Sequence, residues 1–161
     1  MIRRLVLWGT LALIFVAVNV QTYRKEQILA HGQTMLLRLA PRDPRSLMQG
    51  DYMVLRYQIA DALPTAELAG KGRVVVQLDT DGVVTALTGV YRGEPLKPGE
   101  RLLVYRNRNG LRFGAESFFF QEGQADLYAR AAYGELKVAP SGEAVLIGLR
   151  DAQRRPLGAG P

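Results

Sequence analysis

The feature that most constrains the fold is an uncharged, mostly apolar stretch that covers residues 5–20. At a helical rise of about 1.5 Å per residue, it is somewhat shorter than a hydrocarbon core of about 30 Å. Residues 21–23 extend the span, and the long side chains of Arg24 and Lys25 reach the membrane interface from just beyond it. We therefore expect a transmembrane helix that contacts the lipid bilayer through residues 5–23.

The charges around this stretch predict its orientation. Arg3 and Arg4 precede it, and by the positive-inside rule such residues stay in the cytoplasm while the rest of the chain is exported. A cleaved signal peptide is the alternative, but residues 16–22 offer no pair of small residues of the kind that marks a cleavage site. We expect an uncleaved single-pass anchor in a bacterial inner membrane, with the C-terminal domain in the periplasm.

Charge and composition exclude several classes of function. The formal net charge is +6, of which +4 falls within residues 1–25, where four basic residues face no acidic one. The remaining 136 residues hold 17 basic and 15 acidic side chains, so they carry no basic stripe for a nucleic acid. The chain has no cysteine, which excludes thiolate nucleophiles, disulfides and cysteine-based metal sites. We expect neither a nucleic-acid partner nor a cofactor.

Alternating apolar and polar residues after residue 32 predict a β domain. Three pairs of such runs flank turn-forming residues, namely Asp81-Gly82, Asn109-Gly110 and residues 140–142. These residues tolerate the positive φ angles of tight hairpin turns, so we expect three hairpins. No long helices separate the strands, which favours antiparallel pairing. The predicted fold is mainly β, an antiparallel sandwich or partly closed barrel of about eight strands.

The other segments complete a three-part organisation, in which one or two short helices accompany the strands. Residues 65–68 are predicted to form a helical turn and residues 122–132 a short helix. The parts are a membrane anchor with a juxtamembrane helix (residues 1–32), an exported β domain (33–150) and a flexible tail (151–161) that is rich in Gly, Pro and Arg.

One short string in the β domain carries a family resemblance. Gly50, Asp51, Tyr52, Leu55 and Tyr57 spell G-D-Y-x-x-L-x-Y. The chain resembles the GDYxxLxY family of bacterial membrane-anchored proteins, which is named for this string and has no established activity. Members of that family often look like companions of multi-spanning membrane proteins. The resemblance therefore implies a partner of that kind in the membrane.

The motif has a structural and a functional interpretation. In the structural one, the segment is a turn followed by a strand, with Leu55 and Tyr57 pointing into the core. In the functional one, Arg45 and Arg56 each pair with a carboxylate and Tyr52 anchors an interface. The candidate binding residues are Asp43, Arg45, Asp51, Tyr52, Arg56, Glu116 and Phe118.

The aromatic run at residues 117–120, Ser-Phe-Phe-Phe, is predicted to be a strand. Alternation places Phe118 and Phe120 on one face with Glu116, and Phe119 on the opposite face. We expect the strand to be buried on both faces. The alternative is that one face stays open as a docking surface for a partner.

Catalytic residues are scarce, so we expect no enzymatic activity. The single histidine, His31, lies in the juxtamembrane helix, away from any serine that a Ser-His-Asp triad would need. Ser46 with a lysine base is disfavoured because Lys71 and Lys97 are predicted to lie in loops.

The predicted function is that of a membrane-anchored periplasmic β domain that binds or assembles with another membrane protein. The alternative is a periplasmic hydrolase or lyase that uses the carboxylates of Asp51 and Glu116. A third possibility is contact with lipid or cell wall through Arg154 and Arg155.

Overall fold

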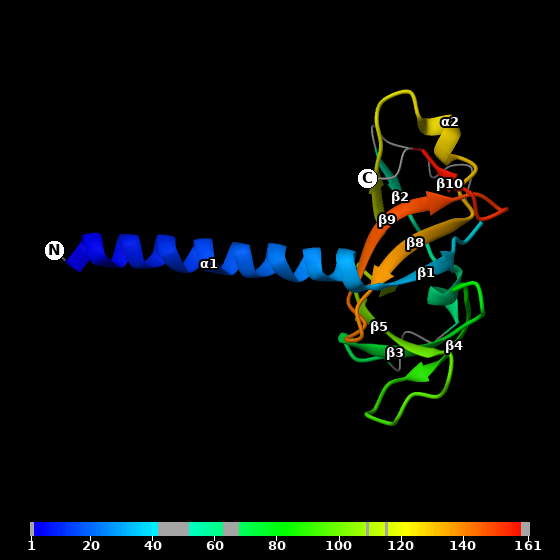
Figure 1. The fold of residues 1–161 in the computed structure, drawn as a ribbon, viewed down its shortest axis with the longest axis horizontal. Helices are drawn as coiled ribbons and strands as arrows, with labels where there is room; N and C mark the ends of the chain where they lie inside the picture. The colour runs from blue at the N-terminus through cyan, green and yellow to red at the C-terminus, as the bar shows by residue number, and fades with distance from the viewer. Residues whose placement is uncertain (1, 42–51, 63–67, 109, 115, 159–161) are drawn as a thin grey trace.

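The computed structural model describes residues 2–41, 52–62, 68–108, 110–114 and 116–158. A long N-terminal helix projects from a β domain whose strands form two curled sheets, each shaped like half a barrel, and a third small sheet (Figure 1). The predicted fold class is confirmed. The strands of the described residues are β1 (Gln33–Arg38), β2 (Tyr52–Val54), β3 (Lys71–Leu78), β4 (Val84–Val90), β5 (Glu100–Asn107), β6 (Leu111–Arg112), β7 (Ser117–Phe119), β8 (Tyr133–Val138), β9 (Ala144–Arg150) and β10 (Pro156–Leu157).

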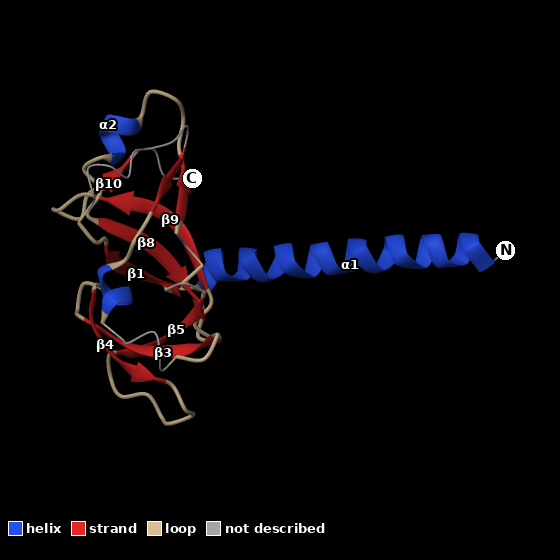
Figure 2. Cartoon of the chain, turned by 180° about the vertical axis from the view of Figure 1, so that it is seen from behind, coloured by secondary structure: helices blue, strands red, loops and turns tan. Residues whose placement is uncertain are grey.

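Helix α1 (Ile2–His31) is long and apolar enough to cross a membrane. Its 30 residues span about 45 Å at the usual helical rise, and Figure 2 shows it standing clear of the β domain. Only Ile28, near its C-terminal end, is buried. The backbone N–H of Gly32 donates to the carbonyl of Ile28 at 2.8 Å and completes the last turn. The predicted continuation of the helix past the apolar stretch is confirmed.

The first curled sheet has the strand order β1-β8-β9-β10, and all its pairs are antiparallel. Three consecutive residues of β1, Met35, Leu36 and Leu37, are buried, so this strand is covered on both faces. Met35 and Leu37 belong to the main core, while Leu36 packs in a smaller cluster with Val83 and Tyr133.

The second curled sheet has the order β4-β3-β5-β6, and the three predicted hairpins are confirmed as β3–β4, β5–β6 and β8–β9. The β3–β4 turn shows why Asp-Gly favours a hairpin. Gly82 has φ of 77°, and the carboxylate of Asp79 accepts hydrogen bonds from the backbone N–H groups of Asp81 and Val83. Lys71, predicted to lie in a loop, is instead the first residue of β3.

Two backbone hydrogen bonds join the curled sheets at opposite ends. The N–H of Leu36 donates to the carbonyl of Gly82 at 2.9 Å, and the N–H of Val104 donates to the carbonyl of Gly142 at 2.8 Å. The turn of each sheet is therefore attached to a strand of the other. The concave faces enclose one continuous core, so the domain is closer to a partly closed barrel than to two flat layers.

The prediction of a strand through residue 59 is wrong in length, but the predicted alternation of buried residues is confirmed. Strand β2 ends at Val54, and residues Gln58–Asp61 form a 3-10 helix, η1. The alternating residues Met53, Leu55, Tyr57 and Ile59 are nevertheless all buried, as predicted. The strand ends early because the chain changes partner. Its backbone pairs first with β7 and then, at residues 56 and 57, with the end of β1.

The short helix predicted within residues 122–132 is present as α2 (Ala125–Tyr128). Most of the turn predicted at 65–68 lies outside the described residues.

Part of the predicted tail contacts the domain, since β10 pairs with β9 and Arg154 forms an ion pair with Asp81. Arg150 also donates a 2.8 Å hydrogen bond to the carbonyl of Arg154. The flexibility of the tail stays a prediction.

Candidate functional site

The motif strand β2 forms a two-stranded sheet with β7, separate from the curled sheets. In its antiparallel register Tyr52 lies opposite Phe119, Met53 opposite Phe118 and Val54 opposite Ser117. Because successive strand residues point to opposite faces, Met53 and Phe118 share one face of this sheet. We call the other face, which carries Val54 and Phe119, the outer face.

The face that carries Met53 and Phe118, which we call the inner face, is held against the core by aromatic packing. The ring of Phe118 lies 6.5 Å from that of Phe120 in a stacked arrangement, and 4.9 Å from that of Tyr128 on α2 in an edge-on one. The rings of Phe120 and Tyr128 are 5.3 Å apart. Met53 opposite them is only 4% exposed. This packing fixes the small sheet on the core, and it accounts for Phe118 structurally.

The outer face is open. Val54 is 67% exposed and Phe119 is 73% exposed, more than any other large apolar residue of the β domain as far as it is described. The expectation that residues 117–120 are buried on both faces is therefore wrong, and the alternative with one open face is observed. The candidate set named Phe118, whereas the exposed aromatic ring is its neighbour Phe119.

Glu116 stabilises the turn that precedes β7. Its carboxylate accepts hydrogen bonds from the backbone N–H groups of Phe113 and Gly114, the latter at 3.0 Å. Its own carbonyl accepts from the N–H of Leu55 at 2.7 Å, which attaches the motif segment to the strand that follows the turn. The residue thus caps a turn and holds the motif at the same time.

The final tyrosine of the motif, Tyr57, is a core residue. Its ring meets that of Phe113 edge-on, with centroids 6.0 Å apart, and the residue is 2% exposed. Burial, and secondarily the negative charge of Glu116, raise the pKa of the Tyr57 phenol well above its ordinary value. Gly134 of β8 makes room for the ring, because a Cβ atom there would lie 2.9 Å from its Cε1 atom.

The other candidate residues are not gathered into one described site. Arg56 pairs with Asp61 at 3.4 Å, and both side chains are exposed. Asp43, Arg45 and Asp51 lie outside the described residues, as does Ser46, and Tyr52 is described through its backbone. The pairing of Asp51 with Glu116 that a hydrolase would use therefore has no described geometry. Within the described ranges, no three His, Cys, Asp or Glu side chains converge as a metal site would require.

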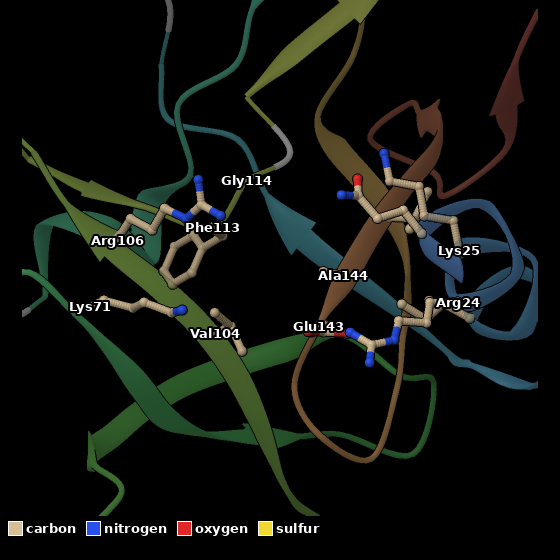
Figure 3. Close-up of a pocket in the computed structure, with 12 residues that line it drawn as sticks. Arg24, Lys25, Lys71, Val104, Arg106, Phe113, Gly114, Glu143 and Ala144 are labelled. Atoms are coloured by element: carbon tan, nitrogen blue, oxygen red, sulfur yellow. The ribbon is translucent and has the colours of Figure 1, made fainter. Parts of the chain in front are cut away.

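Sequence reasoning missed a second feature, a pocket where α1 meets the β domain (Figure 3). Its volume is about 550 Å³, and four basic side chains line it: Arg24 and Lys25 from α1, Lys71 from β3 and Arg106 from β5. These residues are separated by up to 82 positions in the chain, so no local pattern points to them. We call this feature the junction pocket.

Fold and site together define a class of protein: a single N-terminal helix able to span a membrane, followed by a β domain with a motif strand at one corner. The chain belongs to the GDYXXLXY protein family, whose profile matches residues 14–149. The match begins within α1 and runs to β9, so it confirms the resemblance seen in the motif. Comparison with curated proteins found no match, and neither did comparison with solved structures.

Proposed function

We propose that this protein is a membrane-anchored β domain that binds or assembles with another membrane protein through its outer face. The observation that carries the proposal is the exposure of Val54 and Phe119 on a sheet whose opposite face is locked into the core. The anchor keeps the domain at the membrane surface. The motif thereby holds a small apolar platform in a fixed orientation.

The energetics favour a partner for this face. Burial of an apolar side chain such as Val or Phe stabilises a complex by about 1.5–3 kcal/mol before the costs of association. Aromatic side chains are enriched at the centres of interfaces. Val54 and Phe119 are diagonal neighbours on one face of the small sheet, and exposed apolar residues grouped in this way are typical of an interaction site.

The occupant that we propose is an extramembrane segment of a multi-spanning membrane protein. Figure 1 shows β2 near the side of the β domain from which α1 projects, and this position supports a platform that faces the membrane. Companions of this kind are also what the family resemblance implies. We further propose that the anchor lies in a bacterial inner membrane with the domain in the periplasm, because Arg3 and Arg4 precede the apolar stretch.

Site-specific photocrosslinking in native membranes tests the proposal. A photoreactive phenylalanine analogue placed at Phe119 preserves the ring, and the same analogue at Thr88, an exposed residue of β4, is the control. We expect one discrete adduct from position 119, identified by mass spectrometry as a multi-spanning membrane protein, and no such adduct from position 88. Adducts with lipid alone, or the same proteins from both positions, would contradict a protein partner on the outer face.

Co-purification in mild detergent provides the second test. Wild type retains the crosslinked protein, and the double variant Val54→Thr/Phe119→Ser loses it while its melting temperature stays the same. The matched control is Thr88→Ser, which changes an exposed strand residue elsewhere. Retention of the partner by the double variant would contradict the proposal.

The hydrolase alternative finds no support in the described residues. The carboxylate of Glu116 is already engaged by two backbone donors that it holds in place. We therefore propose a binding function without catalysis.

A further inference from the structure

We propose that the junction pocket binds the phosphate headgroup of an anionic membrane lipid. All four basic residues line the pocket; Figure 3 shows Arg24 and Lys25 on its helix side, across from Lys71 and Arg106 on the strands of the second curled sheet. Among the described residues that line the pocket, Glu143, in the turn that precedes β9, is the one acidic residue. The pocket therefore concentrates four positive charges and one negative charge within about 550 Å³.

Within the described part of the chain, the four cations of the pocket differ from other arginines of the protein in their ion pairing. Arg150, Arg154 and Arg155 each form an ion pair with a carboxylate of the domain. Among the described residues, no carboxylate lies within ion-pair distance of Arg24, Lys25, Lys71 or Arg106. Clustered like charges repel one another, and an anion placed between them removes that cost.

The position of the pocket along α1 indicates that a lipid supplies the anion. Arg24 follows the last residue of the apolar stretch by four positions, which is about 6 Å of helix. The polar headgroup layer on each side of a bilayer is about 5–8 Å thick. Arg24 and Lys25 therefore lie at the level of the headgroups, and the strands bring Lys71 and Arg106 to the same level.

The pocket is preformed because the junction between helix and domain is tight. Ile28, which also lines the pocket, is 8% exposed. A Cβ atom on Gly32 would lie only 3.1 Å from the backbone nitrogen of Val138, so the helix end is packed directly against β8. A guanidinium group binds two phosphate oxygens at once, and a lysine ammonium adds a point charge. The acyl chains of the bound lipid would run along the exposed apolar surface of α1.

Native mass spectrometry of the full chain in detergent tests this inference. The probes are phosphatidylglycerol, phosphatidylcholine and inorganic phosphate. The variant is Lys71→Gln/Arg106→Gln, and the matched control is Arg92→Gln/Arg130→Gln, which removes the same charge from exposed positions outside the pocket. Arg24 and Lys25 are left unchanged because they adjoin the membrane-spanning segment.

We expect wild type to retain phosphatidylglycerol in preference to phosphatidylcholine. Affinity for the anionic lipid should fall roughly fivefold for each cation removed, and so by more than tenfold in the pocket variant. The control should stay within about twofold of wild type, because its charges are remote from the lipid. Glu143→Gln removes the one opposing charge, so it should strengthen binding. Thermal melts of all variants verify that the fold is retained.

Three results would overturn the inference. Equal loss in the pocket and control variants would show a response to net charge alone. Equal retention of phosphatidylglycerol and phosphatidylcholine would show that the pocket does not recognise an anionic headgroup. Displacement of the lipid by millimolar inorganic phosphate would make free phosphate the ligand. None of these results affects the proposed docking function of the outer face, which rests on different residues.

Discussion

The motif segment meets opposite environments within a few residues. At its buried end, Leu55 and Tyr57 are each 2% exposed and form part of the main core. Val54, the residue before Leu55, is 67% exposed and shares the outer face with Phe119, which is 73% exposed. Adjacent residues of one segment therefore lie in the core and on an exposed face. One short motif thus contributes side chains to both, and substitutions at its buried and exposed positions should separate stability from binding.

The largest expected effect on stability is at the buried end. Tyr57→Ala should cost about 3–5 kcal/mol, because it removes a fully packed aromatic ring and leaves a cavity between β8 and Phe113. Chemical denaturation of the full chain in detergent measures the loss. Phe119→Ala is the matched control, and similar losses at both positions would break the comparison.

Removal of the carboxylate of Glu116, which caps the turn before β7, should come next. Glu116→Ala should cost about 1.5–3 kcal/mol, because the backbone N–H groups of Phe113 and Gly114 lose a charged acceptor. The control is Glu122→Ala, an exposed residue after the same strand, which should be close to neutral. Denaturation midpoints that shift equally in both variants would argue against the role of Glu116 as a cap.

The close approach of Gly134 to the ring of Tyr57 provides a third test. Gly134→Ala should destabilise by about 1–3 kcal/mol, because the added methyl group overlaps the tyrosine ring. Gly148→Ala on the neighbouring strand β9 is the matched control, since the nearest atom to its Cβ, an oxygen of Glu135, is 3.9 Å away. The control should be neutral or slightly stabilising because it lowers the entropy of the unfolded chain. A neutral Gly134→Ala would mean that the ring is less tightly held than the structure shows.

The raised pKa of Tyr57 predicts a loss of stability at alkaline pH. Above the ordinary tyrosine pKa of about 10, the unfolded chain gives up the phenol proton while folded Tyr57 keeps it. The unfolded state then binds fewer protons, so stability falls by as much as ~1.4 kcal/mol per pH unit from this residue. Tyr57→Phe should show a shallower decline between pH 10 and 11 in the same denaturation measurement. Equal slopes would contradict the assignment.

The smallest expected effect on stability is on the outer face. Phe119→Ser should change the free energy of unfolding by no more than about 0.5 kcal/mol, because the residue is 73% exposed in the folded chain. Retention of the partner in detergent should nevertheless be lost. A large loss of stability would assign Phe119 to the core and remove the outer face as a surface.

Much of this fold follows from local patterns. The apolar stretch predicted α1, the turn-forming residues predicted three hairpins, and alternation identified Met53, Leu55, Tyr57 and Ile59 as buried. Local patterns were misleading where the chain changes partners. A strand was predicted through residue 59, but β2 ends at Val54 because the backbone leaves β7 for β1. Burial on both faces was likewise predicted for residues 117–120, but Phe119 is 73% exposed.

The sequence by itself determined the elements whose causes are local: a helix from an uninterrupted apolar run, hairpins from residues that accept positive φ, and the inward face of each strand from its alternation. Tertiary structure alone decided which faces are covered and which distant charges converge. The junction pocket joins residues of α1, β3 and β5, and the outer face exists because the small sheet has a core on one side only. Both depend on how the sheets close around the core, and that closure is set by contacts between residues far apart in the chain.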